Sequence, residues 1–131
     1  MTIVVEPDAT ARAIREFLRA NPELRNDPVA PETPERSVYG HCYVAAEAYF
    51  HARGGTDSGL DIYCLSWSDV DPEYSGTHWY LRDPTAEAWI DLAIERPEDG
   101  EEIPFSKGRR RAFITGYEPS ARGKRVLEVV Q

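Results

Sequence analysis

The spacing of apolar residues predicts a helix near the start of the chain. In the stretch 8–20 the apolar side chains recur at helical spacing, at Ile14, Phe17 and Leu18. Asp8 or Thr10 is a suitable N-cap, and the Asn-Pro pair that follows ends the helix. The stretch 22–36 then contains four prolines, which is typical of an irregular connector.

A second helix is predicted from His41 to Ala52. Its alanines are strong helix formers, and Gly54 follows as a left-handed C-cap. The small side chains indicate close packing against a sheet. A last helix is predicted over Glu118–Val130, with Val126 among its inward residues.

Between these helices the sequence has the character of β-strands. The predicted strands are Leu60–Ser66, Thr77–Arg82 and Ala88–Ala93, with a short extended piece at Ile3–Val5. A turn at 83–85 makes the last two of the three strands antiparallel neighbours. We expect an α+β fold in which helices pack on a small antiparallel sheet.

Composition narrows the class of protein. The chain has 131 residues, of which 41% are hydrophobic, and this is typical of a single domain over 1–131. No apolar run approaches the roughly 18 residues that a membrane span needs, and the first residues lack the pattern of a signal peptide. The net charge of −8 disfavours nucleic acid. We therefore expect a cytoplasmic protein without nucleic-acid or membrane partners.

The two cysteines have different surroundings. An intracellular pair is poor evidence for a disulfide. Cys64 lies in an apolar strand-like run, where a free cysteine is usually a small buried residue. Cys42 lies at the start of the second predicted helix, where unpaired N–H groups stabilise a thiolate and can also receive an oxyanion.

His78 and Asp91 are the candidate partners of Cys42. His78 lies on a predicted strand and can exchange a proton with the thiol, and Asp91 lies among apolar residues, where a carboxylate needs a partner. Neighbouring antiparallel strands would let Asp91 orient the imidazole. Taken singly, each residue is more simply explained by packing or surface charge, but together they favour a catalytic triad.

A zinc site is the main chemical rival. Cys42, His78 and Asp91 with His41 or Cys64 supply suitable ligands, but no Cys-x-x-Cys or His-x-x-x-His pair gives the local spacing that structural zinc favours. We expect neither a metal nor another cofactor.

Two segments carry a family resemblance. Gly40–Ala45, which is Gly-His-Cys-Tyr-Val-Ala, is followed by Thr77–Arg82, which is Thr-His-Trp-Tyr-Leu-Arg, and then by Asp91 on the next strand. This order resembles the papain-like superfamily in its transglutaminase-like and NlpC/P60-like branches. The segments also resemble small proteins of tailed viruses and prophages of bacteria and archaea, over a core of about residues 38–127.

The resemblance implies a papain-like core and thioester chemistry at Cys42. Such a protein would be a thiol hydrolase or acyltransferase acting on an amide, isopeptide or ester bond of a protein or peptide, including viral structural proteins in a virion. The sequence has no glutamine-type oxyanion donor before Cys42, so Tyr39 or the N–H of Cys42 would serve. The alternative is a non-catalytic accessory or virion-associated domain that keeps the fold and binds protein.

Several other residues are weaker candidates. Trp79 is explained by core packing, although it could shield the Cys–His pair from water. Arg109 and Arg111 belong to the one basic cluster, which is either a solvated loop or a clamp for a substrate carboxylate. Glu47 is expected to be buried and paired with Arg82 or Arg111, and His51 is expected on the surface.

Overall fold

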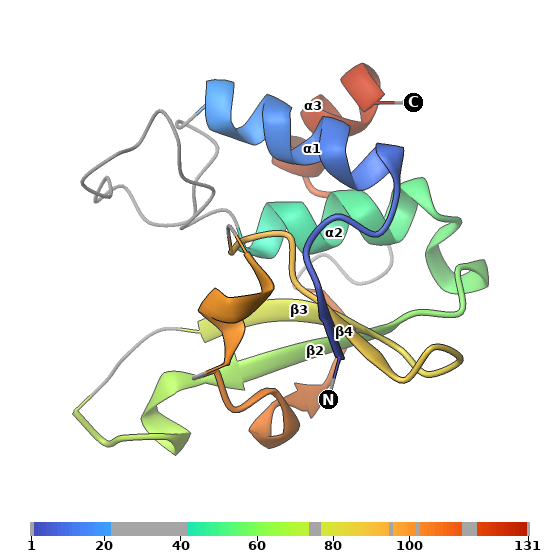
Figure 1. The fold of residues 1–131 in the computed structure, drawn as a ribbon. Helices are drawn as coiled ribbons and strands as arrows, with labels where there is room; N and C mark the ends of the chain where they lie inside the picture. Colours follow the sequence, from blue (N-terminus) through green and yellow to red (C-terminus); the bar gives the residue numbers. More distant parts are fainter. Residues whose placement is uncertain are drawn as a thin grey trace.

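The computed structural model describes residues 2–21, 42–73, 77–94, 96–101, 103–113 and 118–130. Within them the chain forms three α-helices and one five-stranded sheet, which confirms the α+β class. The helices lie on one side of the sheet (Figure 1). None of the helices in these segments is long and apolar enough to cross a membrane.

The sheet is mixed. Its strands follow the order β1 (Thr2–Val4), β4 (Ala88–Ile90), β3 (Thr77–Asp83), β2 (Asp61–Ser66) and β5 (Arg109–Arg110). All neighbours are antiparallel except β1 and β4, which are parallel. The prediction of a purely antiparallel sheet is therefore wrong at this edge. Only strands joined by a short turn must be antiparallel, and the long chain between β1 and β4 leaves either direction open.

The strand β4 ends earlier than predicted. It stops at Ile90, and Leu92 and Ala93 lie in a turn although both are buried. The backbone N–H of Asp91 donates to the carbonyl of Val4 at 3.0 Å, and the Oδ1 of Asp91 accepts from the N–H of Ala93 at 3.0 Å. This side-chain turn ends the strand directly before Asp91.

The helices are capped by polar side chains where caps are described. α1 (Ala9–Ala20) begins after Asp8, whose carboxylate accepts from the N–H of Ala11 at 2.9 Å, as predicted. α3 (Ala121–Val130) begins after Ser120, whose Oγ accepts from the N–H of Gly123 at 3.2 Å. The last helix therefore starts three residues later than the predicted Glu118.

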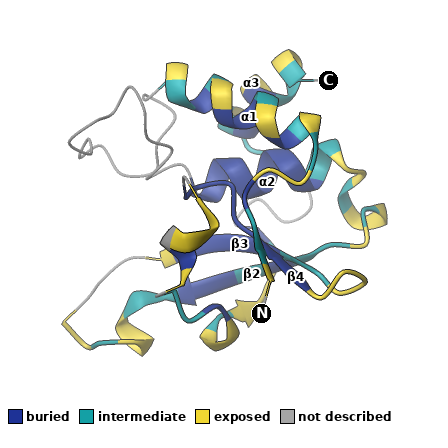
Figure 2. Cartoon of the chain, viewed as in Figure 1, coloured by how far each residue is buried: buried dark blue, intermediate teal, exposed yellow. Residues whose placement is uncertain are grey.

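The helix α2 (Cys42–Ala52) is buried on all sides over Cys42–Phe50 (Figure 2). One side packs on β3, and α1 and α3 cover the opposite side (Figure 1). A helix that is apolar all round belongs in such an interior position. This layer arrangement places the start of α2 beside the start of β3.

Two apolar clusters cover the two faces of the sheet. Trp79 and Leu81 of β3 pack with α2, whereas Tyr80 packs on the other face with Trp89 and Phe105. Side chains alternate along a strand, so His78 shares the face of Tyr80. The α2 cluster also contains residues of α1, namely Ala11, Ile14 and Leu18.

Two polar side chains of α2 lie on its covered side. Glu47 is buried, as expected, and the hydroxyl of Ser120 donates to its Oε1 at 2.5 Å. His51 is half-buried against Phe113, and its Nε2 has no hydrogen-bond partner among the described residues. The expectation of a surface position for His51 is wrong because Phe113 covers this side of the helix.

Candidate active site

Cys42 is the first residue of α2 and lies beside β3. Its thiol donates to the carbonyl of Thr77, the first residue of β3, with the two heavy atoms 3.9 Å apart. Cys42 and Cys64 do not form a disulfide, and the exposed fraction of Cys42 is 8%. The helix start therefore brings the thiol to the end of the strand that carries His78.

His78 and Asp91 form a buried pair. Nε2 of His78 lies 2.5 Å from Oδ2 of Asp91, and the exposed fractions of the two residues are 8% and 1%. His78 lies in β3 and Asp91 directly follows the neighbouring strand β4. The predicted contact between these two side chains is confirmed, although Asp91 lies just beyond its strand.

The pKa of His78 depends on both Asp91 and Cys42. Burial by itself lowers the pKa of His78, but the charge and hydrogen bond of Asp91 and the thiol of Cys42 act in the opposite direction. The net result is a pKa raised from 6.5 to about 10. At neutral pH the imidazole therefore holds its proton, and both Asp91 and Cys42 are close enough to stabilise that form.

Aromatic rings enclose His78 on its face of the sheet. The centroid of its ring lies 5.9 Å from that of Trp67, 5.6 Å from that of Tyr80 and 6.5 Å from that of Phe105. Trp67 and Phe105 come from short 3-10 helices, η3 (Trp67–Asp69) and η5 (Phe105–Lys107). The sequence marks them only as aromatic residues near turns, so their place in the site was not predicted.

The other sequence candidates that the structure describes lie apart from this pair. Tyr39 lies outside the described residues. Trp79 is buried on the opposite face of the sheet, where its ring meets the edge of Tyr43 at 5.0 Å and stacks on Phe113 at 5.5 Å. The structure therefore supports the core-packing interpretation of Trp79.

The arginine cluster lies along the β5 edge of the sheet. Arg109 pairs in register with Cys64, and the guanidinium of Arg111 lies 5.3 Å from the centre of the Trp79 ring. Arg110, between them, forms an ion pair with Asp61 at 3.0 Å. The structure thus groups these arginines with β2 and the core instead of with His78.

A cavity of about 490 Å³ opens near the same edge. Its walls include Phe50, Leu60, Ile62, Arg110 and Arg111. Ile62 lies near the start of β2, whereas the residue opposite His78 lies near the end of that strand. Because a strand rises by roughly 3.3 Å per residue, this difference in position along β2 separates the cavity from the Cys42–His78–Asp91 group.

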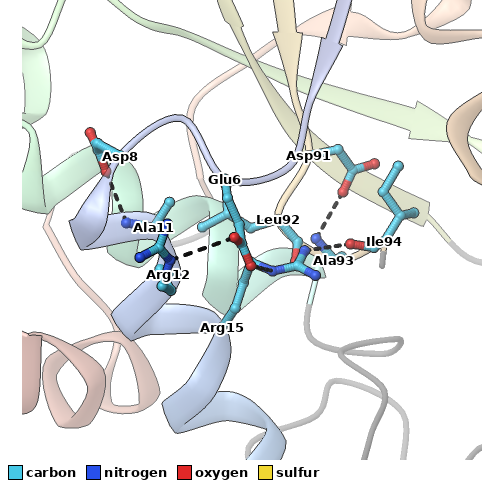
Figure 3. A network of polar contacts seen from close by, with 9 residues as sticks. All are labelled: Glu6, Asp8, Ala11, Arg12, Arg15, Asp91, Leu92, Ala93 and Ile94. Atoms are coloured by element: carbon cyan, nitrogen blue, oxygen red, sulfur yellow. Dashed lines mark hydrogen bonds and ion pairs between the residues drawn. The ribbon is translucent and has the colours of Figure 1, made fainter. Parts of the chain in front are cut away.

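Arg15 is a polar residue near the site that the sequence interpretation missed. Its exposed fraction is 1%, and its guanidinium donates to the carbonyls of Leu92, at 2.9 Å, and of Ile94. Its Nε also donates to Glu6 at 3.1 Å (Figure 3). Its position on the apolar stripe of α1, between Ile14 and Leu18, could have indicated that this arginine is buried.

The described residues contain no group of three or more His, Cys, Asp or Glu side chains that is arranged to hold a metal ion. Comparisons of the chain with family models, curated proteins and solved structures gave no match. The chemistry of the site therefore has to be argued from its own geometry.

Proposed function

We propose that the protein is a small thiol hydrolase or acyltransferase with a papain-like active site formed by Cys42, His78 and Asp91. The observation that carries this proposal is the buried 2.5 Å contact of His78 with Asp91 next to a thiol that opens a helix. A buried charged pair is costly to desolvate, and such pairs with perturbed pKa values cluster at functional sites. The substrate class is an amide, isopeptide or ester bond of a protein or peptide, including a viral structural protein.

In the proposed reaction Cys42 gives its proton to His78 before the substrate binds, so the attacking group is a thiolate beside an imidazolium. Because Nε2 of His78 is bound to Asp91, Nδ1 is the nitrogen left to take the proton of the thiol. The raised pKa of His78 favours the resulting imidazolium. The thiolate then attacks the carbonyl carbon, and backbone N–H groups in the first turn of α2 are suited to stabilise the oxyanion.

Collapse of the tetrahedral intermediate breaks the bond to the leaving group. His78 returns its proton to the departing amine or alcohol, and the acyl group remains on Cys42 as a thioester. Water or a second amine then attacks the thioester, again with His78 as the base, and the thiol is restored. Asp91 keeps the imidazole oriented throughout.

The alternative function is protein binding without catalysis. Two observations favour it: Cys42 has an exposed fraction of only 8%, and the 490 Å³ cavity lies elsewhere along the sheet. The segment before Cys42 and residues 74–76 before Thr77 lie outside the described residues. The two functions are therefore best separated by experiment.

Alkylation of the two free cysteines tests the reactivity of Cys42. Cys64 is an internal control because its exposed fraction, 6%, is almost that of Cys42, and burial raises the pKa of its thiol. With iodoacetamide at neutral pH we expect Cys42 to react at least about tenfold faster than Cys64, as an activated thiolate should. His78→Ala should remove the difference. Equal rates that do not respond to His78→Ala would overturn the proposal.

Acylation separates catalysis from binding. We expect p-nitrophenyl acetate to acetylate the protein once, at Cys42, as seen by intact mass and peptide mapping, and we expect Cys42→Ser to abolish this adduct. Cys64→Ser should leave it unchanged. A reactive Cys42 that forms no acyl adduct and releases no p-nitrophenolate would favour the non-catalytic alternative.

A further inference from the structure

The turn that follows β4 is held from outside the sheet by one buried side chain. Arg15 of α1 donates through Nη1 to the carbonyls of Leu92 and Ile94, the residues on either side of Ala93 (Figure 3). The N–H of Ala93 donates to Oδ1 of Asp91, and Oδ2 of Asp91 contacts His78. The guanidinium therefore holds both flanks of the residue that orients the Asp91 carboxylate.

We propose that Arg15 is a positioning residue of the active site, which fixes the turn after β4 so that Asp91 points at His78. This inference rests on the proposed function of Cys42, His78 and Asp91. Arg15 acts through the turn and does not touch the reacting atoms.

The type of residue at position 15 supports this role. Its neighbours on the buried stripe of α1 are Ala11, Ile14 and Leu18, so an aliphatic side chain would satisfy the packing of the helix without a buried charge. A guanidinium, in contrast, presents several N–H donors in a rigid plane and can hold two carbonyls at once. Its carboxylate partner, Glu6, is about one-third exposed, so the backbone carbonyls are its buried partners.

The carboxylate is fixed at three points. The main chain of Asp91 donates to Val4 of β1, its Oδ1 is held by Ala93, and the turn around Ala93 is held by Arg15. Without the guanidinium, the third point is lost and the turn is held only by its packing and by the N–H of Ala93. A displacement of about 1 Å at a catalytic group is enough to reduce a rate by up to about 100-fold.

Arg15→Gln and Arg15→Lys test the inference, and Arg12→Gln is the matched control. Arg12 lies on the same helix and also pairs with Glu6, at 3.7 Å, but its side chain is 65% exposed and it does not contact the turn. Two measurements are made on the folded proteins. One is the low-field NMR signal of the proton between His78 and Asp91, and the other is the rate of Cys42 alkylation against pH.

We expect Arg15→Gln to lose the low-field signal and to slow the alkylation of Cys42 by about tenfold or more. Arg15→Lys should recover part of both because an ammonium can still donate to the carbonyls, and Arg12→Gln should match the wild type. An Arg15→Gln protein that is folded and keeps both the signal and the rate would overturn the inference.

Two further outcomes are distinguishable. If Arg15→Gln does not fold, Arg15→Lys decides instead, because an ammonium keeps the charge but lacks the rigid plane of donors that holds both carbonyls. A folded Arg15→Lys protein with the full signal and rate of the wild type would overturn the inference. If wild-type Cys42 is unreactive, the proposed function fails, whereas the NMR signal still reports whether Arg15 orients Asp91.

Discussion

Three charged side chains are buried among apolar neighbours, namely those of Arg15, Glu47 and Asp91. The number of residues between each side chain and its hydrogen-bond partner differs widely. The partner of Asp91 is His78, only 13 residues away on an adjacent strand, and it was predictable from a hairpin. Arg15 reaches a carbonyl 77 residues away, and Glu47 a hydroxyl 73 residues away. A sequence shows that each buried charge needs a partner, but it identifies the partner only where a local turn brings the two together.

The pKa values of His51 and His78 should be shifted in opposite directions from the usual value. Asp91 and Cys42 raise the pKa of His78 above the usual 6.5, whereas burial lowers that of His51 below it. In a pH series of NMR spectra we expect His51 to titrate below pH 6.5 and His78 to remain protonated well above it. In Asp91→Asn the titration of His78 should shift downward and that of His51 should not move. A wild-type His78 that titrates at or below 6.5 would contradict this prediction.

Stability should also depend on the protonation of His78. Because its pKa is raised on folding, the folded protein binds more protons than the unfolded chain between pH 6.5 and about 10. The stabilising contribution is complete below pH 6.5 and is lost as the pH rises through this interval. We expect the free energy of unfolding of the wild type to fall with rising pH relative to that of His78→Gln. Denaturant unfolding at several pH values measures it, and parallel curves for the two proteins would refute it.

Elements with a local signal were predicted well, and those defined by pairing were not. The cap and stripe of α1 and the apolar run of α2 lie within their own segments, so these helices have nearly the predicted bounds. β5 is two residues long and exists only because it pairs with β2. The predicted strand from Ala88 was too long because Leu92 and Ala93 are apolar. An apolar residue that is buried in a turn cannot be told by its hydrophobicity from one that is buried in a strand.

The contact between α2 and α3 depends on Gly123. A Cβ at this position would lie 2.2 Å from Oε1 of Glu47, which is buried and bound to Ser120. Gly→Ala inside a helix ordinarily stabilises a protein by about 0.5–1 kcal/mol. Here we expect Gly123→Ala to lower the free energy of unfolding by about 1–3 kcal/mol because of overpacking.

Denaturant unfolding of Gly123→Ala measures the change, with Lys124→Ala, at the exposed neighbouring position, as the control. Gly123→Ala combined with Glu47→Ala should lose most of the steric penalty of the alanine. A stabilised Gly123→Ala protein would show that the approach of Glu47 to α3 is not as close as described.

At the scale of the whole molecule, the N-terminal segment belongs to the core. The resemblance that suggested the active site begins at about residue 38, and α2 and β3 within it carry Cys42 and His78. The fold adds β1 to the sheet beside β4 and packs α1 on the outer side of α2 (Figure 1). The contacts of β1 with β4 and of α1 with α2 join residues that are far apart in the sequence. The local pattern of residues 2–20 therefore does not predict that this segment supports the site.

A chain that begins at residue 38 should therefore fail to form the site. It lacks the parallel partner of β4, the guanidinium that holds the turn after Asp91, and the buried side chains of Ile14 and Leu18. Removing a single buried leucine or isoleucine side chain costs about 2–5 kcal/mol, and typical domains are stable by about 5–15 kcal/mol. We expect the shortened chain to unfold without a sharp thermal transition and its two cysteines to be alkylated at similar rates. Glu16→Ala, an exposed change in α1 of the full chain, should keep both properties of the wild type. A shortened chain that unfolds cooperatively and keeps a fast Cys42 would show that the site needs only the part of the fold that carries the resemblance.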